Sequence, residues 1–377
     1  MYNLLLLGAG KIGYATAMLL GRSGDYDVLA ADIDEVALGR LAGEANVRTV
    51  QLDLSDGRAL RRAMDGRQSA VAACPFSLNP AIAAAALEEG LSYFDLTEDT
   101  ATSKTIREVA TSAKPGQVFM PQCGLAPGFI SILARHLTAG FDRLDEVRLR
   151  VGALPLYPTN RLKYNLTWST DGLINEYCNP CEVIHGGRLM EALPLEGLEH
   201  FSLDGVDYEA FNTSGGVGTL AETLAGQVRN LDYKTVRYRG HRDLMAFLLD
   251  ELRLGNQRAM LKEILERAVP ITSQDVALIF CTVTGWKRGF LTHVTDARKI
   301  YHTELFCEPW SAIQITTATA VAAVVDMYHN GVLAGRGLLR QEDVPFESFI
   351  TNRFGRYYET SAHRLGGAAA AFGEQHV

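Results

Sequence analysis

The sequence has 377 residues, of which 47% are hydrophobic and 21% charged, and this balance excludes a chain that is disordered throughout. The formal net charge is −8 and no run of Lys and Arg stands out, which argues against a nucleic-acid surface. The length favours two domains over one.

The apolar start of the chain, MYNLLLLGAGKIG, is interrupted by glycines too early for a signal peptide or a membrane span. No other apolar run approaches the roughly 20 residues that a span needs. We therefore expect a cytoplasmic protein that does not interact with membranes.

The first predicted unit is a short buried strand at residues 4–7, followed by a glycine turn and a helix. Gly8, Gly10 and Gly13 stand in the spacing G-x-G-x-x-G. Gly8 allows the tight turn, Gly10 lets the backbone approach a pyrophosphate, and Gly13 lets the helix pack against the strand. Strand, glycine turn and helix together predict a Rossmann dinucleotide-binding unit.

The residues around this turn also indicate which dinucleotide binds. Lys11 and Ile12 open the helix, whose N-terminus offers N–H groups to the pyrophosphate. The second predicted strand ends in Asp32, where a carboxylate hydrogen-bonds the ribose hydroxyls of NAD and repels the 2′-phosphate of NADP. No arginine stands beside it in AADIDEVAL. We predict NAD as cofactor, with NADP less favoured.

Further strand–helix units follow up to about residue 137, and their alternation predicts a parallel, doubly wound sheet. Ligands bind such sheets at the carboxyl ends of the strands. For any one of these loops, ordinary turn chemistry is the alternative. The loop residues that we predict to bind the cofactor are Asp53, Leu54, Cys74, Pro75, Asn79 and Leu125.

After about residue 140 the pattern changes to longer, exposed strands of alternating polarity with helices between them. We predict a Rossmann domain at 1–125 and an α+β substrate-binding and dimerisation domain at 126–308. In the segment 309–377, a long helix of small residues is expected to pack back on the first domain. The Ala/Gly-rich end, 361–377, is expected to be a frayed tail.

Six cysteines in a chain of this length do not resemble a disulfide framework. Cys178 and Cys181 form a C-x-x-C pair with His185 four residues on, but no second cysteine pair follows to complete a zinc site. Two reduced thiols in a loop are the favoured interpretation, and we predict no metal.

From the N-terminus to about residue 241, the sequence resembles the saccharopine dehydrogenase family, in particular the branch with saccharopine reductase and L-lysine 6-dehydrogenase. The resemblance implies a lysine-related amine oxidised by a pyridine nucleotide, and a homodimer or larger assembly. The motifs that carry it are GAGKIG, QCGLAPGF, LPLYPTNRLKYNLTWSTDGLINEY, EAFNTSGGVGTL and YKTVRYRGH, in the family's order.

In this family the TWS…G turn faces the substrate. Saccharopine reductases typically carry an arginine before the glycine, whereas here the position is Asp171. A carboxylate attracts an ammonium and cannot clamp a carboxylate, so the difference favours a free amine such as that of L-lysine. The alternative is that Asp171 only caps a helix beginning at Gly172.

The implied reaction moves a hydride from the ε-carbon of L-lysine to NAD, and the imine formed is hydrolysed to an aldehyde and ammonia. The amine must be neutral first, because an ammonium has no lone pair, and its pKa lies near ~10.4. A base is therefore expected. The candidates are Asp171 and Asp95, with Glu98 as a further carboxylate at the substrate. Asp95 has the alternative role of holding the crevice loop through backbone N–H groups.

The α-carboxylate of an amino acid needs cations, and Arg239 and His241 are our candidates. Arg237 lies on the same strand face as Arg239 by the two-residue alternation of a strand. A surface ion pair is the alternative for each arginine. Further predicted substrate contacts, for which packing is the alternative, are Tyr164, Thr213 and Pro127.

Two other classes of function remain open. One is a reductase that condenses an amine with a carbonyl acid, which would need a second anion-binding group near Asp171, such as Arg161 or Lys163. The other is a nucleotide-holding protein without turnover.

Overall fold

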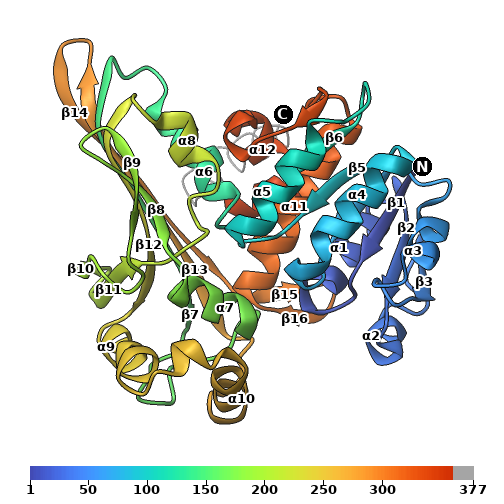
Figure 1. Cartoon of the computed structure of the whole chain (residues 1–377), viewed down its shortest axis with the longest axis horizontal. Helices are drawn as coiled ribbons and strands as arrows, with labels where there is room; N and C mark the ends of the chain where they lie inside the picture. The colour runs from blue at the N-terminus through green and yellow to red at the C-terminus, as the bar shows by residue number, and fades with distance from the viewer. Residues whose placement is uncertain (360–377) are drawn as a thin grey trace, which may run out of the picture.

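The first domain contains a sheet of seven parallel strands (Figure 1). The computed structural model describes residues 1–359. The strand order β17-β6-β5-β4-β1-β2-β3 changes direction between β1 and β4, which is where such sheets bind their ligands. The predicted parallel sheet is confirmed. Its strands are β1 (Tyr2–Leu7), β2 (Tyr26–Asp32), β3 (Val47–Gln51), β4 (Ser69–Ala72), β5 (Ser92–Asp95), β6 (Val118–Met120) and β17 (Gly337–Leu338).

Helices cover both faces of this sheet, which explains why its strands are continuous apolar runs. Leu4 and Leu6 of β1 belong to the core beneath α1, α6 and α11, while Leu5 and Leu7 belong to the core beneath α3, α4 and α5. All four leucines are fully buried. The helices are α1 (Lys11–Arg22), α2 (Glu35–Gly39), α3 (Gly57–Met64), α4 (Asn79–Glu89), α5 (Thr100–Ala110), α6 (Phe129–Thr138) and α11 (Ala312–His329).

The second domain is built on a mixed sheet with the main order β10-β11-β12-β7-β13-β14 (Figure 1). The expectation of exposed strands is wrong for β7, β12 and β13. These strands lie inside the sheet, with a strand on either side, and all three are mostly buried. β13 also packs against α6 and α11. The strands are β7 (Arg143–Pro155), β8 (Cys181–His185), β9 (Arg188–Ala192), β10 (Glu199–Leu203), β11 (Val206–Asn212), β12 (Val228–Tyr238), β13 (Asp275–Lys287) and β14 (Phe290–Tyr301).

The chain returns to the first domain through the short pair β15 (Thr303–Leu305) and β16 (Glu308–Trp310). Ser311 then begins α11 in a capping box with Gln314, and α11 packs against α1. The predicted tail at 361–377 lies outside the described residues. Within residues 1–359, no helix has the length and apolar character needed to cross a bilayer. The remaining helices are α7 (Thr170–Cys178), α8 (Leu220–Leu224), α9 (His241–Ala246), α10 (Arg258–Ala268) and α12 (Phe346–Thr351).

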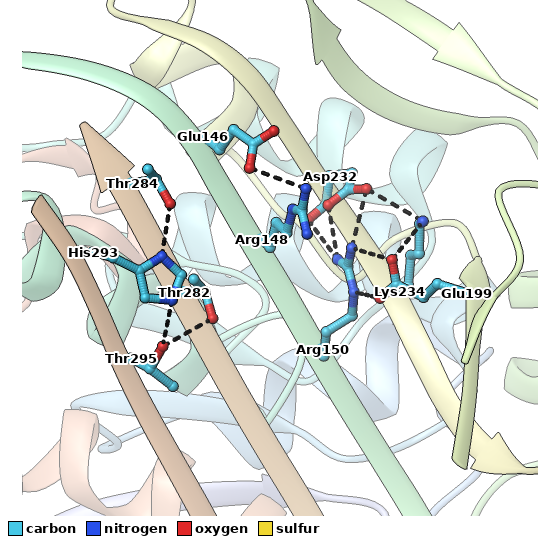
Figure 2. Close-up of polar contacts among 10 residues, drawn as sticks. All are labelled: Glu146, Arg148, Arg150, Glu199, Asp232, Lys234, Thr282, Thr284, His293 and Thr295. Carbon is cyan, nitrogen blue, oxygen red and sulfur yellow. Dashed lines mark hydrogen bonds and ion pairs between the residues drawn. The ribbon is translucent and has the colours of Figure 1, made fainter. Parts of the chain in front are cut away.

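One face of the second sheet carries a network of charged side chains, shown in Figure 2. Arg150 of β7 pairs with Glu199 and, at 2.7 Å, with Asp232 of β12. Because side chains alternate along a strand, the neighbours Val151 and Tyr233 point to the opposite face. That opposite face borders the cavity described next.

Candidate active site

A cavity of about 970 Å³ lies between the carboxyl ends of the central parallel strands and the second domain, where α7, β7 and β12 form its far wall. It therefore occupies the position expected for the ligands of a doubly wound sheet. The predicted site residues that line it are Gly10, Lys11, Ile12, Cys74, Pro75, Asn79, Glu98, Leu125, Pro127 and Asp171.

The glycine loop has the shape that a dinucleotide requires. Gly8 has φ +104°, and a Cβ there would lie 2.4 Å from the carbonyl oxygen of Ala73. A Cβ on Gly13 would lie 1.9 Å from the carbonyl oxygen of Gly8, whereas none of the described atoms lies within 4 Å of a Cβ built on Gly10. Gly10 begins α1 without a side-chain cap, so the first-turn N–H groups remain available to an anion. These residues fit a bound pyrophosphate.

Asp32 holds this loop in place. Its carboxylate accepts hydrogen bonds from the backbone N–H of Ala9 at 2.6 Å and of Asp34 at 2.9 Å. Arg40, which lies just beyond the stretch AADIDEVAL, donates to the carbonyl oxygen of Ala9 at 3.1 Å. A cation therefore stands at the loop beside Asp32, eight residues along the chain.

Asp53 and Leu54 follow β3 but do not line the cavity. The carboxylate of Asp53 accepts hydrogen bonds from the backbone N–H and the hydroxyl of Ser55, at 2.9 and 2.7 Å. It thus stabilises its own turn. The contact of Asp53 and Leu54 with the adenine of a cofactor remains a prediction.

Two carboxylates in the cavity have strongly raised pKa values. Burial, together with the nearby carboxylates, raises the pKa of Glu98, which follows β5, to about 7. Burial also raises the pKa of Glu176 on α7 to about 8, which Arg237 partly opposes. Raised carboxylate pKa values suit proton transfer near neutral pH. Glu176 is not among the site residues predicted from the sequence, although it lies one helical turn after Gly172, on the same side of α7.

Arg237 is the buried cation of the far wall. Its guanidinium donates to the hydroxyl of Tyr177 at 2.8 Å and to the carbonyl of Val236 at 2.9 Å. It lies over the rings of Tyr164 and Tyr177, with 5.1 and 5.7 Å to the ring centroids. Within residues 1–359 it forms no ion pair. A charged planar fork in this setting is suited to a carboxylate ligand.

The two other predicted carboxylate binders do not reach the cavity. β12 ends at Tyr238 and the chain turns at Gly240, so Arg239 is exposed. His241 is buried between the hydroxyl of Tyr177 and the carbonyl of Leu162. Burial and the neighbouring guanidinium lower the pKa of His241 to about 3, so it is neutral. Of the three candidate cations, Arg237 is the one that lines the cavity.

Asp95, Tyr164 and Thr213 lie behind the cavity wall. Asp95 is fully buried and accepts hydrogen bonds from the backbone N–H of Thr97 and Gln122, each at 2.9 Å. Its carboxylate therefore joins the loops after β5 and β6, which was the alternative role, and it has no access to a substrate. Tyr164 and Thr213 are buried as well and contribute packing.

Ser169 caps α7 by accepting the N–H of Gly172 at 3.1 Å, so Asp171 is not the helix cap. Asp171 lies in the first turn, where a carboxylate favours the helix dipole. Its side chain is 58% exposed and pairs with Lys262 of α10 at 2.5 Å. A solvated, paired carboxylate is a poor base, and Glu98 is the better candidate.

Gly172 explains how the turn brings groups together. A Cβ at this position would lie 2.3 Å from the ring of Trp168 and 2.9 Å from a carboxylate oxygen of Glu98. The missing side chain lets both groups lie against α7. On the other side of the turn, the Nζ of Lys11 donates to the carbonyl of Thr167 at 3.1 Å and so joins the glycine loop to the second domain.

No metal site is evident in the described part of the chain, where groups of three or more His, Cys, Asp or Glu side chains suited to a metal are absent. Cys178 and Cys181 both carry free thiols. Burial raises the pKa of each thiol, so neither is activated.

A parallel sheet with a glycine loop, facing a cavity closed by a second mixed sheet, defines a two-domain dinucleotide-binding protein. Residues 4–120 match the family model for the saccharopine dehydrogenase NADP-binding domain, and residues 124–355 match the model for the saccharopine dehydrogenase C-terminal domain. The chain belongs to the saccharopine dehydrogenase family. Its cofactor class is a nicotinamide dinucleotide.

Two curated relatives are named saccharopine dehydrogenase [NADP(+), L-glutamate-forming]. The protein from Schizosaccharomyces pombe is 23% identical over 198 residues, which covers 51% of this chain and 44% of that protein. The protein from Saccharomyces cerevisiae is 23% identical over 267 residues, with 66% and 57% covered. The chain thus matches about half the length of these relatives.

The solved structure of apo saccharopine dehydrogenase (L-Glu forming) from Saccharomyces cerevisiae has the same fold. It superimposes with a TM-score of 0.76 at 16% identity, and the match covers 93% of this chain and 97% of that one. The predicted combination of a Rossmann domain with an α+β domain is thereby confirmed.

Proposed function

We propose that this protein is an amino-acid dehydrogenase that oxidises the ε-amine of L-lysine. The charges that line the cavity carry this proposal. They comprise the carboxyl groups of Glu98, Glu176 and Glu266, the carboxylate of Asp171, which Lys262 already pairs, and the cations Lys11 and Arg237. Lysine has two ammonium groups and one carboxylate, so it complements a cavity in which carboxylates outnumber cations. Saccharopine carries more carboxylates than lysine and complements it less well.

Each group has a role in this reaction. The guanidinium of Arg237 binds the α-carboxylate, and Trp168 with Leu166 and Ile271 forms an apolar wall along the methylenes. The glycine loop would hold a nicotinamide dinucleotide, which would supply the hydride acceptor for the carbon that bears the amine. The carboxylate of Glu98 takes a proton from the ε-ammonium, which leaves the lone pair that stabilises the imine.

Incubating the protein with NAD or NADP and a panel of amines tests this function. We expect reduced dinucleotide to form with L-lysine, and more slowly with L-ornithine, whose shorter chain reaches Glu98 less well. Saccharopine should give no reduction. Oxidation of saccharopine in preference to lysine would refute the assignment.

The names of the relatives favour the second candidate, a saccharopine-type reductase. This reaction needs a further anion-binding group in the cavity. The groups suggested for it, Arg161 and Lys163, are exposed and do not line the cavity. Oxidation of the reduced dinucleotide only when a keto acid and an amine are both present would establish this alternative.

We propose NAD as the preferred cofactor, although the matched family model is that of an NADP-binding domain. The carboxylate of Asp32 supports NAD, whereas Arg40 offers a cation that suits a 2′-phosphate. We expect Asp32→Ala to lower kcat/KM for NAD more than for NADP. Arg40→Ala is expected to weaken NADP and leave NAD nearly unchanged. A wild-type kcat/KM that is higher for NADP would reverse the assignment.

We also propose that the protein forms a homodimer through the second domain. β14 is an edge strand that pairs only with β13 among the described strands, and Phe290 and Leu291 at its start are 75% and 64% exposed. Edges of this kind need cover. Light scattering should give about twice the 41.2 kDa of one chain, and Leu291→Lys should shift the mass towards one chain. A wild-type monomer at micromolar concentration would contradict this.

A further inference from the structure

Glu176 and Arg237 face the same cavity from α7 and β12. Glu176 is only 6% exposed and Arg237 only 2%. In their ionised forms they carry opposite charges, yet within residues 1–359 they do not form an ion pair with each other. No donor in that part of the chain hydrogen-bonds the carboxylate of Glu176. Buried charges are costly when they lack partners, so a ligand that supplies both missing partners would bind strongly here.

The head of an α-amino acid has the required form, because it carries an ammonium and a carboxylate on one carbon. We propose that Glu176 binds the α-ammonium while Arg237 binds the α-carboxylate, so that this pair selects α-amino acids among amines. This subsite rests on the proposed function and makes it more specific. It leaves Glu98, on the nucleotide side of the cavity, for the reacting amine.

The surroundings of Glu176 give the subsite a measurable signature. In the absence of ligand, burial raises the pKa of Glu176 to about 8, so it is largely protonated at pH 7. A bound ammonium favours the ionised form, and binding should therefore release a proton. The titratable groups near Glu176 are Tyr177 on the same helix, Arg237 and Tyr233 on β12, Glu98 after β5, Cys181 on β8 and Tyr164.

L-norleucine is the probe that isolates this subsite, because it has the α-amino acid head and the methylenes but no reacting amine. Calorimetry in two buffers of different ionisation enthalpy measures both its affinity and the proton released. We expect wild-type protein to bind L-norleucine with proton release at pH 7. Glu176→Gln should weaken binding at least tenfold and abolish the proton release.

Glu182→Gln serves as the matched control, because Glu182 is a half-buried glutamate of the same domain outside the cavity. It should leave both quantities unchanged. Equal binding of norleucine by wild-type protein and Glu176→Gln would overturn the subsite even if lysine is oxidised. Binding that depends on Glu176 without any oxidation of lysine would support the subsite and overturn the proposed reaction instead.

Discussion

Arg237→Met is expected to lower kcat/KM for L-lysine by roughly 30-fold to several thousand-fold. Removing one partner of a buried, hydrogen-bonded charge pair costs about 2 to 5 kcal/mol. The guanidinium of Arg237 is buried and fixed by Tyr177, so it meets the α-carboxylate without reorganisation. Steady-state kinetics with L-lysine measure the loss. With 1,5-diaminopentane, which lacks the carboxylate, wild type and variant should differ little.

Arg150→Met is the matched control for this substitution. Arg150 is likewise 2% exposed and lies on the adjacent strand β7, but its partners Glu199 and Asp232 are on the opposite face of the sheet (Figure 2). We expect it to lower the Tm and to leave kcat/KM per folded enzyme unchanged. If the two variants lose activity equally, with lysine and with the diamine, Arg237 has a structural role only.

The choice between Arg237 and Arg239 shows what the sequence alone could not settle. Strand alternation correctly places both on one face for as long as the strand continues. β12, however, ends at Tyr238, and Gly240 with φ +97° redirects the chain before His241. Strand ends depend on tertiary contacts that a local pattern does not contain, so the motif indicated the strand that lines the cavity but not which of its arginines does.

The first domain could be predicted because its signals are local. The glycine spacing, the apolar runs and the acid that ends β2 all lie within a few residues of the atoms they position. The burial of β7 and β13 depends instead on partners far along the chain, since β7 pairs with β12 and β13. Polar residues in these strands suggested exposure, as the charge of Arg150 in β7 illustrates. Only the fold brings Glu199 and Asp232 close enough to pair with that charge.

For the carboxylates of the site, too, the sequence alone does not show which of them are free to act. Asp95, Glu98, Asp171 and Glu176 are all acids near family motifs, and composition does not separate them. Their surroundings do, because backbone N–H groups occupy Asp95 and Lys262 pairs with Asp171. Half-buried Glu98 and buried Glu176 are left at the cavity, with raised pKa values. Desolvation of this kind arises from packing between the two domains and has no local signature in the sequence.

Glu98→Gln is expected to lower kcat with L-lysine by about 100-fold or more, the usual contribution of a positioned base. The amide keeps the shape beside Gly172 and Trp168 but cannot accept the proton. Asp171→Asn is the matched control, because it also replaces a cavity-lining acid by its amide, but Asp171 is exposed and paired with Lys262. We expect it to change kcat by less than about threefold, which corresponds to under 1 kcal/mol.

The pH dependence distinguishes a base from a structural residue. In the wild type, the rate should rise as pH increases through about 7, where Glu98 ionises, and rise further towards the pKa of the lysine amine. Glu98→Gln should lack the first rise. The folding stability of the wild type should change in the opposite sense. Because burial raises the pKa of Glu98 above its value in the unfolded chain, the wild type loses stability as the pH rises from that value through about 7. The variant escapes that loss, so its Tm relative to wild type should be higher at pH 8 than at pH 5. An intact first rise in the variant would assign the proton transfer to another group.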